Sequence, residues 1–150
     1  MSRIKDEIEE AFKTALKTQE KMKISALRLL RAALKNREIE KRGGLDDSEV
    51  IAVIRGLIRQ GQDAARQFEE GGRNDLAEKE KAEGAVFSQF LPPQAAAEEV
   101  EAVIDRIIRE SGASGMKDMG KVMKAAMADL SGRAEGQMIQ TLVKQKLTAL

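Results

Sequence analysis

Hydrophobic residues recur along this chain at spacings of three and four, which is the period of an α-helix that buries one face. Segment 2–17 illustrates the pattern, since its Ile, Ala, Phe and Leu residues fall on one side of a helix. Polar and glycine-containing interruptions separate this segment from others like it. The pattern predicts seven helices and no strands, with the helices over residues 2–17, 24–42, 46–70, 74–91, 96–111, 116–130 and 135–147.

Two consecutive prolines, Pro92 and Pro93, mark the main interruption. A proline lacks the amide hydrogen that a helix needs and disfavours helical geometry in the residue before it, so the fourth helix must end ahead of them. We therefore place a boundary at residues 92–95. The predicted fold is all-α, with an N-terminal subdomain of long helices over residues 1–91 and a compact three-helix C-terminal subdomain over residues 96–150.

Residues at several predicted helix ends are of the types that satisfy free backbone groups. Ser2 is suited to cap the first helix, and Asp46 with Glu49 has the spacing of a capping box, although that motif normally begins with Ser or Thr. Gly112 is expected to end the fifth helix, because glycine readily adopts the left-handed conformation found there.

Composition restricts the chemistry that the protein can perform. Of the 150 residues, 42% are hydrophobic but only 3% are aromatic, so Leu, Ile, Val, Met and Ala must fill the core. The chain has no His and no Cys, which excludes Ser-His-Asp triads, thiolate nucleophiles and His- or Cys-ligated metals. We therefore predict no catalytic residues, no metal and no cofactor, and a protein that acts by binding.

Segment 2–17 mixes charged and hydrophobic residues and lacks the continuous hydrophobic region of a signal peptide. No stretch approaches the ~20 hydrophobic residues of a membrane span. We expect a cytoplasmic protein with no membrane partner.

The net charge is only +1, but the charges are unevenly distributed. Residues 1–42 carry 12 basic and 7 acidic groups, residues 43–93 carry 6 and 10, and residues 112–150 carry 6 and 3. In the second predicted helix, Arg28, Arg31, Lys35 and Arg42 lie within about 60° of one another at ~100° per residue. Such a row is either a solvated charged face or a surface that contacts nucleic acid phosphates.

The sixth predicted helix carries a second basic row, Lys117, Lys121 and Lys124. We expect the opposite face to pack in the core, which leaves the lysines exposed; that face contains Met116, Met119, Met123, Ala126, Met127 and Leu130. Arg133 follows this helix, and Lys144 lies on the outer side of the last one. The residues predicted to contact nucleic acid are Lys117, Lys121, Lys124, Arg133, Lys144, Arg28, Arg31 and Lys35.

Three further features have both a functional and a structural interpretation. The methionines could form an adaptable partner groove or pack in the core. The loop 112–115 has GxxG spacing and could hold a phosphate or be a plain turn. The carboxylates of residues 69–83 could bind a divalent cation or form i,i+4 surface pairs with neighbouring Lys and Arg. In each case we favour the structural interpretation.

Four segments stand out together, namely residues 27–36 with 38–41, 68–76, 90–92 and 112–123 with 132–136. They resemble the GatB/YqeY family over essentially the whole chain. The segment with GxxG spacing and the Gly-Arg-Ala-Glu-Gly sequence that follows it carry the most specific part of the match. Glu135 stands where the family more often has Asp, and residues 95–96 are Ala where a Ser cap is common.

The resemblance implies a two-part helical fold related to the tail domain of GatB, a subunit of the glutamine-dependent amidotransferase that corrects misacylated Glu-tRNA(Gln) and Asp-tRNA(Asn). A similar domain is appended to some glutaminyl-tRNA synthetases. In those settings the domain helps to grip tRNA and does not hold the catalytic centre. The family's usual description, carbon–nitrogen ligase activity with glutamine as amido-N-donor, belongs to the complex. The implied partners are thus tRNA and an amidotransferase or aminoacyl-tRNA synthetase, without catalysis by this chain alone.

Overall fold

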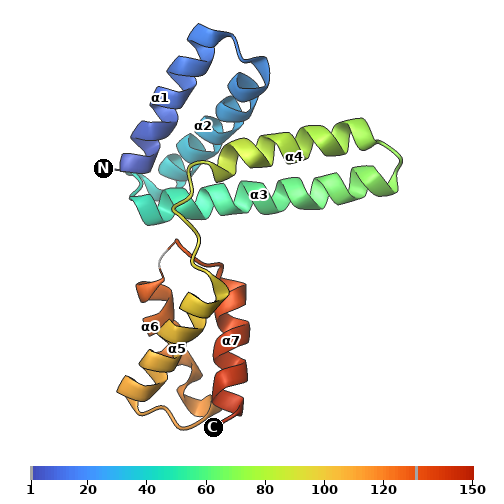
Figure 1. The fold of residues 1–150 in the computed structure, drawn as a ribbon. Coiled ribbons are helices and arrows are strands. Elements are labelled where there is room, and N and C mark those ends of the chain that lie inside the picture. Colours follow the sequence, from blue (N-terminus) through green and yellow to red (C-terminus); the bar gives the residue numbers. More distant parts are fainter. Residues whose placement is uncertain (1, 131) are drawn as a thin grey trace. The chain divides into compact units, whose positions relative to one another are not determined.

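The structure, a computed structural model, describes residues 2–130 and 132–150. Within these ranges it contains seven α-helices, one short 3₁₀ helix and no strand, so the all-α prediction is confirmed (Figure 1). The chain divides into two compact units, one ending at Leu91 and the other beginning at Pro92. Each unit has its own hydrophobic core.

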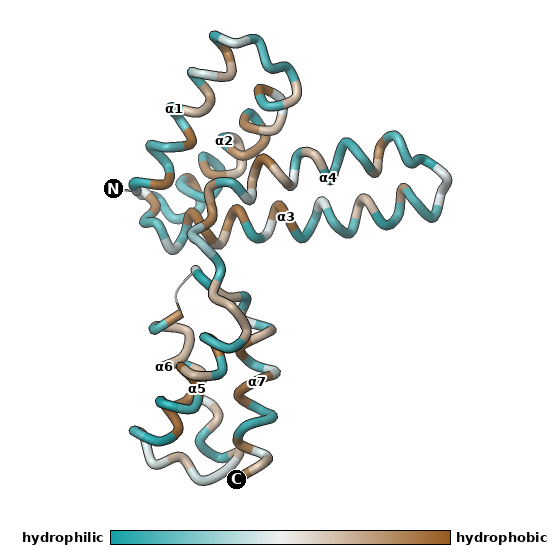
Figure 2. Tube along the Cα trace, viewed as in Figure 1, coloured by the Kyte–Doolittle hydropathy of each residue, from teal (hydrophilic) through white to brown (hydrophobic). Residues whose placement is uncertain are grey.

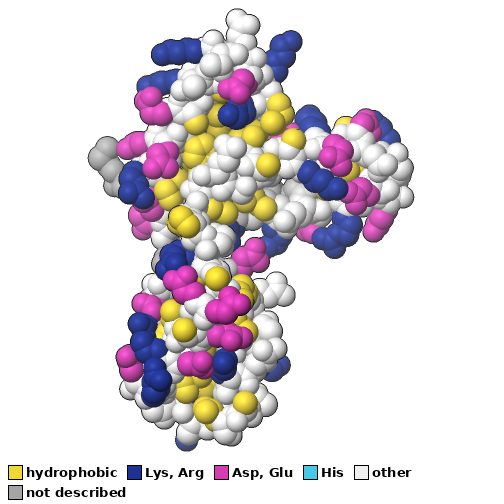
Figure 3. Space-filling view, in the orientation of Figure 1, with side chains coloured by type: hydrophobic (Ala, Val, Ile, Leu, Met, Phe, Trp, Pro, Cys, Tyr) yellow, Lys and Arg dark blue, Asp and Glu magenta, His cyan; other side chains and the backbone are white. Residues whose placement is uncertain are grey.

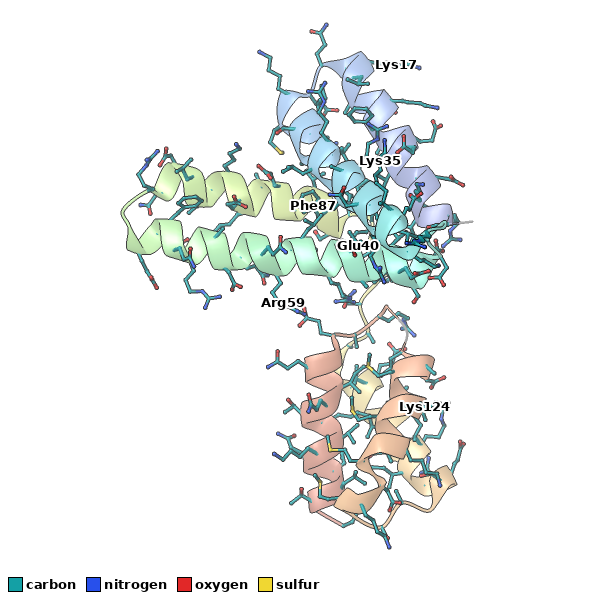
Figure 4. All side chains as sticks on the ribbon, turned by 180° about the vertical axis from the view of Figure 1, so that it is seen from behind. Lys17, Lys35, Glu40, Arg59, Phe87 and Lys124 are labelled. Carbon is teal, nitrogen blue, oxygen red and sulfur yellow. The ribbon has the colours of Figure 1, made fainter. Side chains whose placement is uncertain are left out.

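The first unit consists of two helical hairpins that pack across each other (Figure 1). Its helices are α1 (Arg3–Thr18), α2 (Lys21–Lys41), α3 (Asp47–Glu70) and α4 (Asn74–Ser88). The core lies where α1 and α2 meet the beginning of α3 and the end of α4, and Phe87 fills the space between α4 and α2 (Figure 4). The side chains that are fully or almost fully buried there include Ile8, Leu27, Leu30, Leu34, Val50, Ile54, Val86 and Phe87.

The far end of the α3–α4 hairpin projects beyond this core and is mostly hydrophilic (Figure 2). Ala65 and Ala77 are the buried residues of this part, at 3% and 1% exposure, so the two helices approach closely there. Acidic and basic side chains are interspersed on its surface (Figure 3). Lys81 contacts Glu69 across the hairpin at 2.5 Å and Glu78 at 3.7 Å, and Arg73 contacts Asp75 at 3.1 Å. The segment therefore forms surface ion pairs as expected, but the predicted i,i+4 spacing is wrong, since these three pairs lie across the hairpin, at i,i+3 and at i,i+2.

The predicted capping groups act as the sequence indicates. The Ser2 hydroxyl accepts a hydrogen bond from Lys5 N–H at 3.0 Å. Asp46 and Glu49 form a reciprocal capping box, in which Glu49 N–H donates to Asp46 Oδ1 at 2.8 Å and Asp46 N–H donates to Glu49 Oε1 at 3.2 Å. An aspartate thus replaces the usual Ser or Thr in this motif.

In the first unit, two helix limits differ from the prediction by three residues. The second helix begins at Lys21, three residues early, because Gln19 adopts a left-handed conformation (φ 58°) that turns the chain within two residues. The fourth helix ends at Ser88 rather than at residue 91. The next three amides bond to carbonyls only three residues back, with Leu91 N–H donating to Ser88 at 3.1 Å, so the helix tightens before Pro92.

The second unit is a three-helix bundle formed by α5 (Ala97–Ser111), α6 (Met119–Asp129) and α7 (Gly136–Thr148). Its core contains Val100, Ile104, Ile107, Val122, Ala126, Leu130, Ile139, Val143 and Leu147. Ion pairs between Arg106 and Asp129 and between Lys146 and Asp105 join neighbouring helices. Gly112 ends α5 at φ 68°, as predicted, whereas Ala96 and Glu135 make no side-chain capping hydrogen bond.

The prediction that the methionine face of the sixth helix is buried is only partly confirmed. Its first turn is the 3₁₀ helix η1 (Met116–Asp118), which precedes α6. Met116 and Met127 are 45% and 44% exposed, and Val122, which the pattern did not place inside, is fully buried. The stripe is centred on Val122, Ala126 and Leu130 because these small and branched side chains let the three helices approach closely. Core packing of the remaining methionines, Met119 and Met123, is confirmed by their partial burial against this stripe.

Candidate nucleic-acid interface

The lysine row of the second unit is exposed, as the spacing requires. Lys121 and Lys124 lie on α6 opposite Val122 and Ala126, and Lys124 extends from the outer side of the helix (Figure 4). Lys117 belongs to η1, so it continues the row through a 3₁₀ turn instead of along one straight α-helix. Among the described residues, none of the three lysines forms an ion pair, and only Lys121 makes a hydrogen bond, from its Nζ to the Ser111 carbonyl at 3.3 Å.

Arg133 lies in the same unit but is engaged within the chain. Its guanidinium contacts Glu99 at 2.6 Å, and its carbonyl accepts a hydrogen bond from Ala95 N–H at 2.8 Å. Arg133 therefore fastens the segment before α5 to the connection between α6 and α7. Lys144 is exposed on α7 beside the buried Val143.

In the first unit, the structure separates the four residues of the basic stripe. Arg42 lies just beyond the end of α2, where it is the C-cap in a left-handed conformation (φ 62°). Arg31 is half-buried between α1 and α2, where its guanidinium lies 4.2 Å from the Phe12 ring centroid and its Nε is 2.9 Å from Glu9. These contacts make Arg31 a packing residue of the α1–α2 hairpin. Lys35 is exposed on the α2 surface beside α1 (Figure 4), and Arg28 lies on the side of α2 that faces α4.

The loop with GxxG spacing is a satisfied turn. Ser114 N–H donates to Asp118 Oδ2 at 2.9 Å, and the Ser111 carbonyl accepts a hydrogen bond from the Lys121 ammonium. Ala113 N–H likewise donates to the Ile108 carbonyl at 3.2 Å, so two amides of this loop are already occupied, which favours the interpretation as a turn.

A cleft between α2 and α4 groups charged residues of which the sequence indicated only Arg28. It has a volume of about 600 Å³ and is lined by Lys21, Ser25 and Arg28 from α2 and by Lys79 and Glu83 from α4. Glu83 is only 7% exposed. Burial, and secondarily the charge of Glu80, raises the pKa of Glu83 above its ordinary value. A signal was present in the sequence, because Glu83 occupies a position of the inward face of α4 together with Val86 and Phe87.

The family model for Yqey-like protein matches residues 5–147, which is almost the entire chain and includes residues of both units. The chain belongs to the YqeY-like family. The resemblance found in the sequence is thereby confirmed, and both the lysine row and the α2–α4 cleft lie within the matched YqeY-like region.

Two kinds of relative are similar to this YqeY-like chain. One subunit of the glutamyl-tRNA(Gln) amidotransferase of Thermococcus gammatolerans is 31% identical over 98% of the chain, and the chain spans only 24% of that protein's length. Altered inheritance of mitochondria protein 41 of Lachancea thermotolerans is 28% identical over 89% of the chain and 75% of that protein. The predicted relation to a subunit of a tRNA-dependent amidotransferase is therefore confirmed.

Within the described residues of this YqeY-like chain, no group of three or more His, Cys, Asp or Glu side chains is arranged to hold a metal ion. In the same part of the chain, no helix is both long and hydrophobic enough to cross a membrane. The lysine row and the α2–α4 cleft mainly expose ammonium and guanidinium groups. Such groups bind anions through charge and hydrogen bonds.

Proposed function

We propose that this YqeY-like chain is a tRNA-binding accessory protein whose main contact is the row Lys117, Lys121 and Lys124. The observation that carries the proposal is that these three neighbouring cations are exposed and form no ion pair with another described residue. Lysines of this kind bind phosphates by releasing the counterions that surround nucleic acid. Lys144, Lys35 and Arg28 are exposed cations that serve as additional contacts.

The relatives support a tRNA link. The Thermococcus gammatolerans protein is named for an amidotransferase that acts on glutamyl-tRNA(Gln), and this chain is similar to about a quarter of it, 24%. We infer that the shared part contributes binding and that the amide-forming chemistry belongs to other parts of such complexes. The purified chain is accordingly expected not to form amides from glutamine.

The binding mode follows from the side chains available. The chain has no Trp or Tyr and only four Phe, of which Phe87 is buried and Phe12 lies against Arg31. Stacking on unpaired bases is therefore a minor contribution. Recognition rests on the phosphate backbone and on the shape of the RNA.

A filter-binding titration of the full chain against tRNA at several salt concentrations tests the proposal. Replacing Lys117, Lys121 and Lys124 by Ala should weaken binding and reduce the slope of log affinity against log salt by about two to three, since each lysine contributes about one. The matched control replaces three exposed cations of the first unit, Lys13→Ala, Lys17→Ala and Arg59→Ala, and removes the same charge. Equal losses in the two variants, or no binding at low salt, would refute the proposal.

A second candidate function is docking on an amidotransferase or aminoacyl-tRNA synthetase. It is favoured by the occurrence of a similar segment inside the longer Thermococcus gammatolerans protein, because a segment fused in one organism can act by association in another. The near-neutral net charge of +1 also differs from that of dedicated RNA-binding domains, whose pI typically exceeds about 9. Affinity capture of such an enzyme from cell extract, in a complex that survives nuclease treatment, would establish direct docking. Loss of the complex on nuclease treatment would show that RNA joins the two proteins.

A further inference from the structure

The cleft between α2 and α4 collects three cations that form no ion pair with another described residue, although the charge of Lys79 acts on Glu83 of the same cleft and partly offsets the rise in the pKa of Glu83. The three cations, Lys21, Arg28 and Lys79, are exposed at its rim. Their neighbours on the same two helices behave differently, since Lys23 pairs with Glu20 at 3.6 Å and Lys81 pairs with Glu69 at 2.5 Å. The fold therefore leaves positive charge available at this cleft while neutralising it nearby.

Glu83 adds an acceptor to the same cleft. Its side chain lines the cleft and is 93% buried, being 7% exposed, yet it forms no hydrogen bond with another described residue. The burial is that of the side chain as a whole, because among the described residues no buried side-chain oxygen lacks a hydrogen-bond partner. The carboxyl oxygens of Glu83 therefore still meet solvent at the cleft, and a ligand that displaces this solvent has to replace its hydrogen bonds. An ionised carboxylate accepts hydrogen bonds and donates none. A ligand that complements Glu83 must therefore supply an O–H or N–H group.

We propose that this cleft binds a nucleotide unit, with the phosphate held by Lys21, Arg28 and Lys79 and a sugar hydroxyl donating to Glu83. Residues four apart on a helix have Cβ atoms about 5–6 Å apart, so Lys79 and Glu83 can contact the phosphate and the sugar of one nucleotide. The volume of about 600 Å³ falls within the range of small-ligand sites. The Ser25 hydroxyl, also at the cleft, offers a further polar contact.

This site lies in the first unit and involves none of the lysines of the second unit that carry the proposed tRNA contact. The two proposals share only Arg28, which is an additional contact in the proposed tRNA interface, so the nucleotide site stands or fails separately from the lysine row. The nucleotide is either a free mononucleotide or one unit of an RNA strand, because both present the same phosphate and sugar.

Isothermal titration calorimetry of the full chain at pH 8 tests the inference, with uridine monophosphate, inorganic phosphate and uridine as probes. The monophosphate should bind more tightly than either of the other two. The variant Arg28→Ala, Lys79→Ala should bind it at least about tenfold more weakly, because two charge-assisted contacts are lost. The control Lys17→Ala, Arg59→Ala removes the same two residue types from exposed positions on α1 and α3 and should change affinity by less than about twofold.

The conservative variant Glu83→Gln separates a ligand contact from a general charge effect. Removing the negative charge should strengthen the binding of inorganic phosphate. The monophosphate should gain less or lose affinity, since its hydroxyl then donates to a neutral amide oxygen, so its preference over phosphate should fall by about threefold or more. An unchanged preference would overturn the role of Glu83. Equal affinities for phosphate and monophosphate in the wild-type chain, or equal losses in the Arg28/Lys79 and Lys17/Arg59 variants, would overturn the nucleotide site.

An oligouridine titration distinguishes the two sources of the nucleotide. Tighter binding of the oligomer than of the monophosphate, abolished by Arg28→Ala, Lys79→Ala, identifies an RNA strand as the ligand, whereas binding of the monophosphate alone identifies a free nucleotide. The triple variant of Lys117, Lys121 and Lys124 should leave monophosphate binding unchanged. Failure of the tRNA proposal and failure of the nucleotide site therefore give different results.

Discussion

One hydroxyl and one carboxylate fasten the beginning of α1 to the beginning of α3, and removing either tests how this junction is held. Asp47 accepts hydrogen bonds from the Ser2 hydroxyl and, at 3.1 Å, from Ile4 N–H. Ser2 is 4% exposed, and its oxygen also accepts from Lys5 N–H at 3.0 Å. The same hydroxyl therefore caps α1 and links it to α3.

The magnitudes follow from these contacts. Ser2→Ala removes an N-cap worth ~1 kcal/mol and a hydrogen bond to a partly exposed carboxylate, for a loss of about 2 kcal/mol in the free energy of unfolding. Asp47→Ala removes two hydrogen bonds to that carboxylate and should lose about 2–3 kcal/mol. The Ser2–Asp47 bond is lost in both variants, so the double variant should lose about 1–2 kcal/mol less than the sum.

Urea unfolding of the full chain, followed by helical circular dichroism, measures this coupling. The control pairs Asp47→Ala with Ser88→Ala, because the Ser88 hydroxyl bonds only to the Ala85 carbonyl, at 2.9 Å, on an exposed surface of α4. Those two changes should be additive within about 0.5 kcal/mol. Additivity of Ser2→Ala and Asp47→Ala within the same margin would refute the shared hydrogen bond.

The pH dependence gives an independent reading of the same junction. The Ser2 hydroxyl, followed by Ile4 N–H, holds the pKa of Asp47 below its ordinary value of 3.8. Because the unfolded chain then binds the proton more readily, the contribution of Asp47 to stability is present above the unfolded pKa and is lost as pH falls through the folded one. The stability difference between the wild-type chain and Asp47→Asn should therefore shrink on acidification below about pH 4, the ordinary range of this carboxyl.

Three other residues give predictions of known sign. Glu83→Gln should stabilise the chain at neutral pH. Burial raises the pKa of Glu83 in the folded chain, so the stability that its protonated form contributes is lost as pH rises through that folded pKa. The gain in the free energy of unfolding, measured in urea, should therefore vanish toward about pH 4, where the carboxyl becomes protonated in both the folded and the unfolded chain. Gly112→Ala, at φ 68°, should lower the free energy of unfolding by about 1 kcal/mol in thermal unfolding. Arg31→Ala should lower it by about 1 kcal/mol through loss of the Phe12 and Glu9 contacts, while tRNA affinity in filter binding stays within about twofold of wild type.

Most of the fold could be predicted because its signals are local. Helical periodicity predicted all seven α-helices, and the capping residues Ser2, Asp46 and Gly112 predicted three of the helix ends. The errors in helix limits and in the buried face of α6 arose where turns or contacts between helices determine the structure. Nothing local indicated that Gln19 would turn the chain in two residues, or that the helix before Pro92 would tighten at Ser88. The inward face of α6 depends on how closely the three helices pack around Val122. Hydrophobicity alone favoured the methionines and contains no information about that packing.

The candidate sites were harder to predict because the availability of a charge depends on partners distant in sequence. Arg31 and Lys35 look alike in the second helix, yet Glu9, twenty-two residues away, occupies Arg31. Likewise Glu99, thirty-four residues away, occupies Arg133. Lys21 and Lys79 approach one cleft although most of the first unit separates them in sequence. Helical spacing predicts which face a side chain occupies but not which charge on another helix meets it.

The distinction between engaged and available cations gives the basic residues of this chain two different roles. Those that meet a carboxylate, such as Arg31 and Arg133, stabilise helix contacts, and changing them should alter stability first. Lys117, Lys124 and Arg28 form no ion pair with a carboxylate among the described residues, so their charge is available to bind an anion from solvent. A net charge of +1 therefore understates the capacity of the protein for anions, because internal pairing removes many acidic and basic groups together and leaves local excesses of positive charge on α6 and at the α2–α4 cleft.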